Sequence, residues 1–272
     1  MDVPILLGVT AGVVANCIIT YIILRNKSLR VRSNIYIVNF CICNILYLIF
    51  TPLILNLFSA AERIHVSVIC YSDEIFFLFM FGDYLFICII LLDWYIVTYK
   101  SLRTSARCRA SYKLVIVSVW TIIIVLMLTI ILQCSTGVSL FAFIAAIAIL
   151  SYFITLILIV FISIMKFINE RTTSIIEVKT NLPLIYVLTY FLCWLPNCLY
   201  IVIISVFNLH GLVAFALGTF VIGYTYSPIL LVIMYKRDEK FGKALRKSLC
   251  NVEPENSEEN HVNGDEHLTT LI

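Results

Sequence analysis

Long apolar stretches recur from one end of the chain almost to the other, and they constrain its fold more than any other feature. Each is about 20 residues or longer, which as a helix is enough to cross the roughly 30 Å hydrocarbon core of a bilayer. Because no water is present there, the backbone groups of a crossing segment must pair within it, so each stretch is expected to be a helix. A membrane β-barrel would show short segments of alternating hydrophobicity instead. The expected spans lie near Pro4–Leu24, Ser33–Ser59, Ser67–Thr98, Tyr112–Gln133, Val138–Phe167, Thr180–Phe207 and Leu212–Tyr235.

Composition excludes an ordinary soluble domain. Of the 272 residues, 62% are hydrophobic and 13% are charged, whereas roughly 25% of a soluble domain is charged. The predicted fold is therefore an all-α, seven-transmembrane helix bundle. Its weakest point is the separation of the fourth and fifth spans, because only Cys134–Gly137 lies between them. Without a loop there the crossings would number six, but the positions of the basic loops favour seven.

Basic residues gather in four segments between or after the spans, and these segments predict the orientation. Lys and Arg resist translocation, so segments rich in them stay in the cytosol. All but Arg63 of the 19 basic residues lie on one predicted face, which places the N-terminus outside. These residues are expected to meet anionic lipid, and no nucleic-acid partner is indicated. The four segments hold Arg25, Lys27, Arg30 and Arg32; Lys100, Arg103, Arg107, Arg109 and Lys113; Lys166, Arg171 and Lys179; and Lys236, Arg237, Lys240, Lys243, Arg246 and Lys247.

The ten cysteines are divided among several environments. Cys108 lies in a cytosolic loop, where a thiol stays reduced. On the outer face lie Cys70, which opens the third helix, and Cys134, in the short second outer loop. A bridge between these two is favoured over two free thiols. The cysteines within the helices are interpreted as small apolar residues: Cys17, Cys41, Cys43, Cys88, Cys193 and Cys198.

Several short motifs follow one another in a fixed order along the spans. They are Gly12 and Asn16 in the first span; Ser33–Asn39 and Thr51-Pro52 in the second; Asp93-Trp94-Tyr95 at the end of the third; Leu102 in the loop after it; Trp120 in the fourth; Cys193-Trp194-Leu195-Pro196 in the sixth; and Ser227-Pro228 in the seventh, followed by the amphipathic stretch Glu239–Leu249. In order and spacing this set resembles the rhodopsin-like (class A) G protein-coupled receptors, nearest the chemokine and peptide receptors.

The resemblance implies a receptor that couples to a heterotrimeric G protein, with or without an extracellular ligand, and a short amphipathic helix after the seventh span. The minimal outer segments are similar to those expected of a diverged, virus-encoded member, so the plasma membrane or a host cell membrane is the expected location. The implied activation switch comprises Asp93, Trp94, Tyr95, Leu102, Trp194, Pro196, Ser227 and Pro228.

Departures from the family pattern affect this switch. The family has Asp-Arg-Tyr where this chain has Trp94, and an indole supplies neither the charge nor the five donors of a guanidinium. Leu231 stands where the family has a tyrosine, and Pro183 is expected to kink the cytoplasmic half of the sixth helix. We therefore expect loss of the resting-state lock and weakened or ligand-independent coupling. The alternative is a receptor-like scaffold or decoy without G protein signalling, acting through partner receptors, receptor oligomers or trafficking.

Polar residues within the spans form a second candidate site. Where the family has an aspartate in the second helix this chain has Asn44, and the carboxylate appears instead as Asp83 in the third. Asn16 and Ser227 are expected beside them. A charge inside a membrane bundle is costly and indicates function, so the sequence predicts a sodium site near Asp83. The alternative is a protonated, neutral Asp83 that is hydrogen-bonded to Asn44.

Other classes of membrane protein fit the sequence less well. The four histidines lie outside the spans, and Asp83 and Asp93 are too far apart along one helix to act as a pair, so neither an enzyme nor a metal site is expected. A retinal protein would need a lysine in the seventh span, and this chain has none there. A transporter would show internal repeats and helices broken by Gly or Pro, whereas this chain shows no repeat and has nine glycines. Ligand capture is weakly supported, because the outer acids are few: Asp2, Glu62, Asp73 and Glu74.

The C-terminal segment differs from the rest. Residues 1–249 form the receptor domain, whereas residues 250–272 are polar and acidic and are expected to be disordered. Cys250 would sit at the membrane surface and is interpreted as a palmitoylation site or, alternatively, as a reduced thiol. The ending Thr270-Leu271-Ile272 fits a PDZ-domain ligand, in which the carboxylate and an apolar last side chain enter a groove. The alternative for this ending is a solvated terminus.

Overall fold

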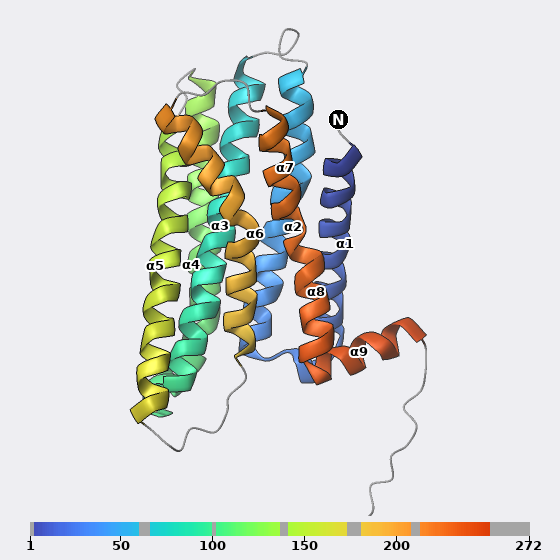
Figure 1. Cartoon of the computed structure of the whole chain (residues 1–272), viewed down its shortest axis with the longest axis vertical. Helices are drawn as coiled ribbons and strands as arrows, with labels where there is room; N and C mark the ends of the chain where they lie inside the picture. Colours follow the sequence, from blue (N-terminus) through green and yellow to red (C-terminus); the bar gives the residue numbers. More distant parts are fainter. Residues whose placement is uncertain are drawn as a thin grey trace, which may run out of the picture.

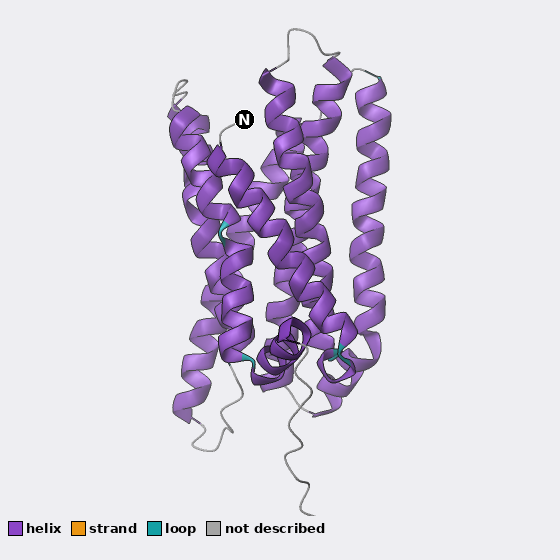
Figure 2. Ribbon diagram, turned by 90° about the vertical axis from the view of Figure 1, so that its right-hand side faces the viewer, coloured by secondary structure: helices purple, strands orange, loops and turns teal. Residues whose placement is uncertain are grey.

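The computed structural model describes residues 3–59, 66–99, 102–136, 141–172, 181–207 and 213–250. Over these ranges the chain forms helices joined by short connections, without a strand (Figure 2). The elements in order are α1 (Val3–Arg25), the 3-10 turn η1 (Lys27–Leu29), α2 (Arg32–Ser59), α3 (Val66–Tyr99), α4 (Leu102–Ser135), α5 (Phe141–Thr172), α6 (Leu182–Phe207), α7 (Val213–Tyr224), α8 (Tyr226–Arg237) and α9 (Glu239–Cys250).

Seven stretches of the described residues are long and apolar enough to cross a membrane, and α7 and α8 together supply the seventh. They run beside one another as a bundle, and α9 extends sideways from the end of α8, across the direction of the bundle (Figure 1). The predicted all-α, seven-helix bundle is confirmed, and the chain is a multi-pass membrane protein. The fourth and fifth spans are separate, because α4 ends at Ser135 and α5 begins at Phe141.

The helices differ from the predicted spans in several features. The region before Tyr112 is helical, since α4 begins at Leu102. The seventh span is interrupted at Thr225. The kink expected at Pro183 is wrong: α6 begins at Leu182, so this proline occupies the first turn, where a missing backbone N–H breaks no hydrogen bond. The proline inside α6 is Pro196.

The third helix forms the centre of the bundle. α3 packs against α2, α4, α5 and α6, and 67% of its spanning window is buried, compared with 17% for α4 and 22% for α5. The outward faces of α4 and α5 expose many large apolar side chains, including Leu128 and Ile157. Water would solvate such a surface poorly, whereas lipid tails match it. α4 and α5 are therefore the lipid-facing edge of the molecule.

Aromatic side chains fill the middle of the bundle. Tyr190 of α6 is fully buried and meets Tyr226 of α8 edge-to-face, with ring centroids 5.0 Å apart. It also packs edge-on against Tyr84 of α3 at 5.9 Å. Trp194, one turn further along α6, packs against Tyr47 of α2 at 5.5 Å. Edge-to-face pairs of this kind add stabilisation beyond their buried area, so this aromatic core fixes the spacing of α2, α3, α6 and α8.

A sharp corner separates α8 from α9. The backbone of Asp238 is extended, and its carboxylate accepts a 3.0 Å hydrogen bond from the Phe241 N–H, as a helix N-cap does. Gly242 permits the close approach, because a Cβ there would lie 2.7 Å from the Tyr235 carbonyl oxygen. On α9, Phe241 and Leu245 are buried against the bundle. The amphipathic C-terminal helix predicted from the sequence is confirmed.

Candidate functional site

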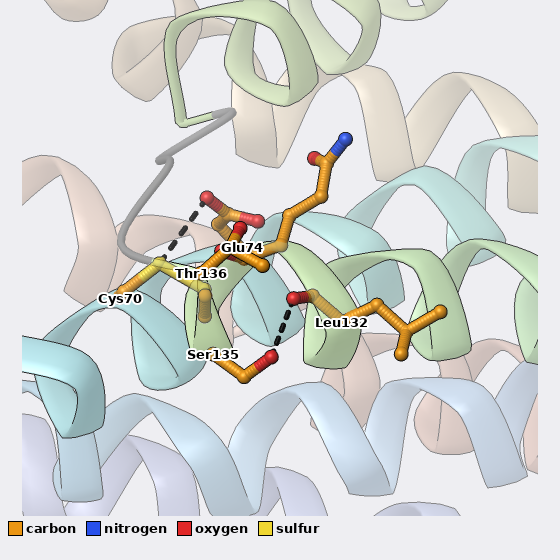
Figure 3. The surroundings of a disulfide bond; sticks show 7 residues. Cys70, Glu74, Leu132, Ser135 and Thr136 are labelled. Atoms are coloured by element: carbon orange, nitrogen blue, oxygen red, sulfur yellow. Dashed lines mark hydrogen bonds between the residues drawn. A yellow bond between two sulfur atoms is a disulfide. The ribbon is translucent and has the colours of Figure 1, made fainter.

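The predicted disulfide is present between Cys70 and Cys134 (Figure 3), with an S–S distance of 2.01 Å and a Cα–Cα distance of 5.9 Å. One detail of the prediction is wrong, because Cys134 lies in the last turn of α4 rather than in a loop. The bridge therefore joins two helices directly. Glu74, one turn after Cys70, also departs from expectation: it is fully buried beside the bridge instead of exposed for a ligand. Cys70, Glu74 and Cys134 lie close enough together to hold a metal ion. Since both sulfurs belong to the disulfide, however, these cysteines offer no thiolate ligand.

Four polar side chains from four helices meet in the bundle core. The Asn16 amide of α1 donates to Asn44 Oδ1 at 2.8 Å and to Ser227 Oγ at 3.1 Å. The Ser227 hydroxyl donates to Asn44 Oδ1 at 3.0 Å. The Asn44 amide in turn donates to Asp83 Oδ2 at 2.6 Å. None of the four is more than 2% exposed. We call Asn16, Asn44, Asp83 and Ser227 the polar cluster; it ties α1, α2, α3 and α8 together.

The polar cluster contains more acceptors than donors. Asp83 Oδ1 and Asn16 Oδ1 are both buried without a hydrogen-bond partner, although buried acceptors are normally satisfied. Within the described ranges no salt bridge involves Asp83. A carboxyl group in such surroundings needs a proton or a cation, and oxygen atoms are the ligands that a hard monovalent or divalent cation prefers. The donor set therefore fits a sodium ion as well as a protonated carboxyl group.

A buried ion pair lies near the C-terminal end of α3. Arg32, the first residue of α2, places a guanidinium nitrogen 2.8 Å from Asp93 Oδ1, and the two side chains are 10% and 7% exposed. Sequence reasoning assigned Arg32 only to a basic loop and named no partner for Asp93. The structure gives Asp93 a cationic partner from a different helix. The signal was the position of Arg32 at the start of an apolar span.

The two residues after Asp93 pack into the bundle. Trp94 is 6% exposed and belongs to the hydrophobic core, so its ring faces the bundle interior. Tyr95 is half-buried against the same core. Leu102 begins α4, and its side chain lies outside the described residues. The family-like triplet is thus integrated into helix packing in this chain.

The sixth and seventh spans meet around Trp194. Trp194 is 2% exposed, and it lies so close to α7 that a Cβ on Gly223 would be 2.8 Å from its ring. Sequence reasoning missed the neighbouring link between Asn197 and Thr219, whose hydroxyl donates to the Asn197 amide oxygen at 3.3 Å. Two buried polar residues in apolar spans were the available signal for it.

The proline of the seventh span follows the break at Thr225. The Thr225 N–H bonds to the Ile222 carbonyl at 3.1 Å, and the helix resumes at Tyr226, so Ser227 and Pro228 occupy the first turn of α8. Pro228 has no N–H for the Tyr224 carbonyl four residues earlier, which accounts for the interruption.

The motif residue Trp120 of the fourth span joins two helices. Its indole N–H donates to Asn39 Oδ1 at 2.9 Å, which links α4 to α2.

Two predicted sites lie at or beyond the limit of the described residues. Cys250 is the last residue of α9, and its side chain is outside the described set. The C-terminal motif Thr270-Leu271-Ile272 and the acidic tail also lie outside it. Comparison with known proteins gives no assignment, since no family model and no curated protein matches the sequence.

Proposed function

We propose that this chain is an atypical class A-like G protein-coupled receptor with weakened or ligand-independent coupling, its N-terminus outside and α9 on the cytosolic side. The observation that carries the proposal is the polar cluster. It brings together side chains from α1, α2, α3 and α8 at the four places where the resemblance puts the family's polar core. The Cys70–Cys134 bridge and the Trp120–Asn39 bond agree with the same alignment of helices.

Weak coupling is supported by the cytosolic end of α3. A guanidinium that leaves its acid on activation is available to a G protein, whereas the buried indole of Trp94 is not. Asp93 is held instead by Arg32, which belongs to α2. Separation of α6 from α3, the movement expected of an active receptor of this family, leaves this α2–α3 ion pair intact. The pair therefore stabilises the bundle without opposing that movement, and basal activity is set by other contacts.

A sodium ion is the cofactor that we propose for the polar cluster. Asp83 and Asn16 would hold it through their unpartnered oxygens, Oδ1 of each. When bound, the cation supplies positive charge that balances the Asp83 carboxylate in a medium of low dielectric constant. Two further residues would support this site: Asn44 orients the carboxylate by donating to Oδ2, and Ser227 connects the site to α8.

A second function, a receptor-like scaffold without G protein signalling, is favoured by the same burial of Trp94. An assay of constitutive G protein activation separates the two. Cells expressing the unliganded protein are tested against each class of Gα subunit, beside mock-transfected cells and cells with equal surface expression of a silent membrane protein. The receptor proposal expects activation above both controls for at least one Gα class. If activation equals that of both controls for every Gα class, the receptor proposal fails and the scaffold function is supported instead.

The orientation is tested separately. An epitope tag placed before Val3 should bind antibody on intact cells, whereas a tag placed after α9 should bind only after permeabilisation. The reverse pattern would refute the proposed orientation, and it would also contradict the charge bias of the loops.

A further inference from the structure

Two neighbouring helices bring three side chains of metal-ligand type together at one end of the bundle. Cys70 and Glu74 stand one turn apart on α3, and Cys134 lies in the last turn of α4. The two sulfurs and a carboxylate oxygen of Glu74 all lie within 4.8 Å of one another. Figure 3 shows the Glu74 carboxylate beside the bridge. We call Cys70, Glu74 and Cys134 the bridge triad.

The bridge triad is enclosed by the protein. Glu74 and Cys134 are buried, with 0% and 2% exposed, and Cys70 is half-buried. An ionised carboxylate is costly in such surroundings unless charges or hydrogen bonds compensate it. The Cys70 sulfur lies 3.5 Å from Glu74 Oε1, but a disulfide sulfur has no hydrogen to donate, whereas a thiol has one. The Glu74 carboxyl group is therefore placed to interact with the reduced form of Cys70.

The helices that carry the bridge triad are held together by contacts other than the bridge. α3 and α4 pack directly against one another. The last turn of α4 is closed by two hydroxyls: Ser135 donates to the Leu132 carbonyl at 2.6 Å, and Thr136 donates to the Gln133 carbonyl at 2.8 Å. Both cysteines lie within helical turns. Opening of the S–S bond therefore leaves their Cα atoms, which are 5.9 Å apart, close to their present positions.

Two thiolates and one carboxylate form a ligand set that suits Zn²⁺. Zn–S bonds of about 2.3 Å and Zn–O bonds of about 2.0–2.2 Å, in tetrahedral geometry, place the ligand atoms roughly 3.5–4 Å apart. Once the S–S bond is open, rotation about the Cα–Cβ bonds separates the two sulfurs to such a spacing. Soft thiolates favour zinc over the hard cations Mg²⁺ and Ca²⁺. With three protein ligands, the fourth position is open to water or to another ligand.

We propose that the Cys70–Cys134 bridge is the oxidised form of a zinc site, and that the bridge triad binds Zn²⁺ when a dithiol reductant opens the bridge. The reductant gives two electrons and two protons to the S–S bond and becomes a disulfide itself, while Cys70 and Cys134 become thiols. Zn²⁺ then displaces the two thiol protons, which pass to solvent, and Glu74 supplies a carboxylate as the third ligand. The metal takes over the link between α3 and α4. This site is independent of G protein coupling.

The test measures metal binding to the full-length protein in detergent micelles. The protein is reduced with dithiothreitol, separated from the reductant by gel filtration without oxygen, and titrated with Cd²⁺, whose thiolate complexes absorb in the ultraviolet. The variant Cys70→Ser/Cys134→Ser, treated in the same way, gives the absorbance that the other cysteines contribute. The reduced wild type should bind one Cd²⁺ per chain more than this variant, and added Zn²⁺ should displace it. The wild type that has not been reduced should match the variant.

The role of the carboxylate is tested by Glu74→Gln, which keeps both cysteines. Loss of a residue that only supports a metal ligand weakens metal affinity by about 10- to 100-fold, so loss of a ligand should weaken Cd²⁺ binding by about 10-fold or more. The matched control is Glu239→Gln, which removes an exposed carboxylate from α9 and should leave the affinity unchanged. Zn²⁺ should also raise the melting temperature of the reduced wild type by mass action, without effect on the reduced Cys70→Ser/Cys134→Ser variant.

Three outcomes would overturn the proposal. One is a reduced wild type that binds no more Cd²⁺ than the reduced double variant. Another is a Glu74→Gln variant with the affinity of the wild type, because the carboxylate would then not be a ligand. The third is a reduced wild type that is unfolded at the assay temperature both with and without Zn²⁺, because the bridge triad would then exist only in its disulfide form.

Discussion

Disruption of the Arg32–Asp93 ion pair should destabilise the protein strongly when one partner is changed and much less when both are. The two side chains are 10% and 7% exposed, so removal of one charge leaves the other buried without compensation. Such a loss costs about 3 kcal/mol or more. We therefore expect Arg32→Gln and Asp93→Asn each to lower the free energy of unfolding by about 3 kcal/mol. The double variant should cost about as much as one single variant, which gives a coupling energy of about 3 kcal/mol.

The assay uses buried thiols that the structure provides. Cys41, Cys43 and Cys198 are buried and outside the disulfide, so a thiol-reactive dye should report their exposure as the detergent-solubilised protein is heated. A loss of 3 kcal/mol lowers the melting temperature by about 6 to 12 °C on the scale of globular proteins of similar length.

A matched control comes from the exposed pair on α9. Glu239 and Lys243 are 80% and 75% exposed, and exposed ion pairs contribute little. Lys243→Gln should therefore leave the melting temperature unchanged. The reasoning would be refuted if Arg32→Gln melted like the wild type, or if the effects of the two single changes simply added in the double variant.

Three other outcomes are expected. Sodium chloride should raise the melting temperature of the wild type above its value in choline chloride at equal ionic strength, and Asp83→Asn should abolish this difference; a sodium effect that persists in the variant would place the ion elsewhere. Gly223→Ala should cost about 1–3 kcal/mol, because its methyl group would lie 2.8 Å from the Trp194 ring, whereas Gly218→Ala, with no atom within 4 Å, should be neutral or slightly stabilising in the same melting assay. Trp94→Arg should raise constitutive G protein activation at equal surface expression, and an unchanged signal would mean that another departure from the family pattern limits coupling.

The elements of the fold could be predicted because lipid imposes one solution on an apolar run of sufficient length. The seven spans were predicted from hydropathy. The disulfide was predicted because Cys70 and Cys134 were both placed on the outer side of the membrane. The helix ends were less predictable. The segment before Tyr112 is polar and reads as a loop, yet it continues α4, because a helix can extend beyond the hydrocarbon into the aqueous phase.

Contacts between distant residues were less predictable from the sequence. The meeting of Asp83 with Asn44 could be expected, because polar residues in spans seek one another. The pairing of Arg32 with Asp93 could not, since it depends on how α2 and α3 cross at their ends. Glu74 shows the same limit: its position after Cys70 suggests an outer acid, but its burial depends on the packing of α3 against α4.

The break at Thr225 separates α8 from α7, and side-chain hydrogen bonds hold both ends of α8. At its start, Ser227 is bonded to Asn44 in the polar cluster; at its end, Asp238 and Arg246 fix it to α9. A tilt of α8 about Thr225 would therefore move α9 with it along the membrane surface. Anionic lipid around the exposed lysines of α9 would resist that movement. The proposed cation near Asp83 would oppose it from the other end of α8.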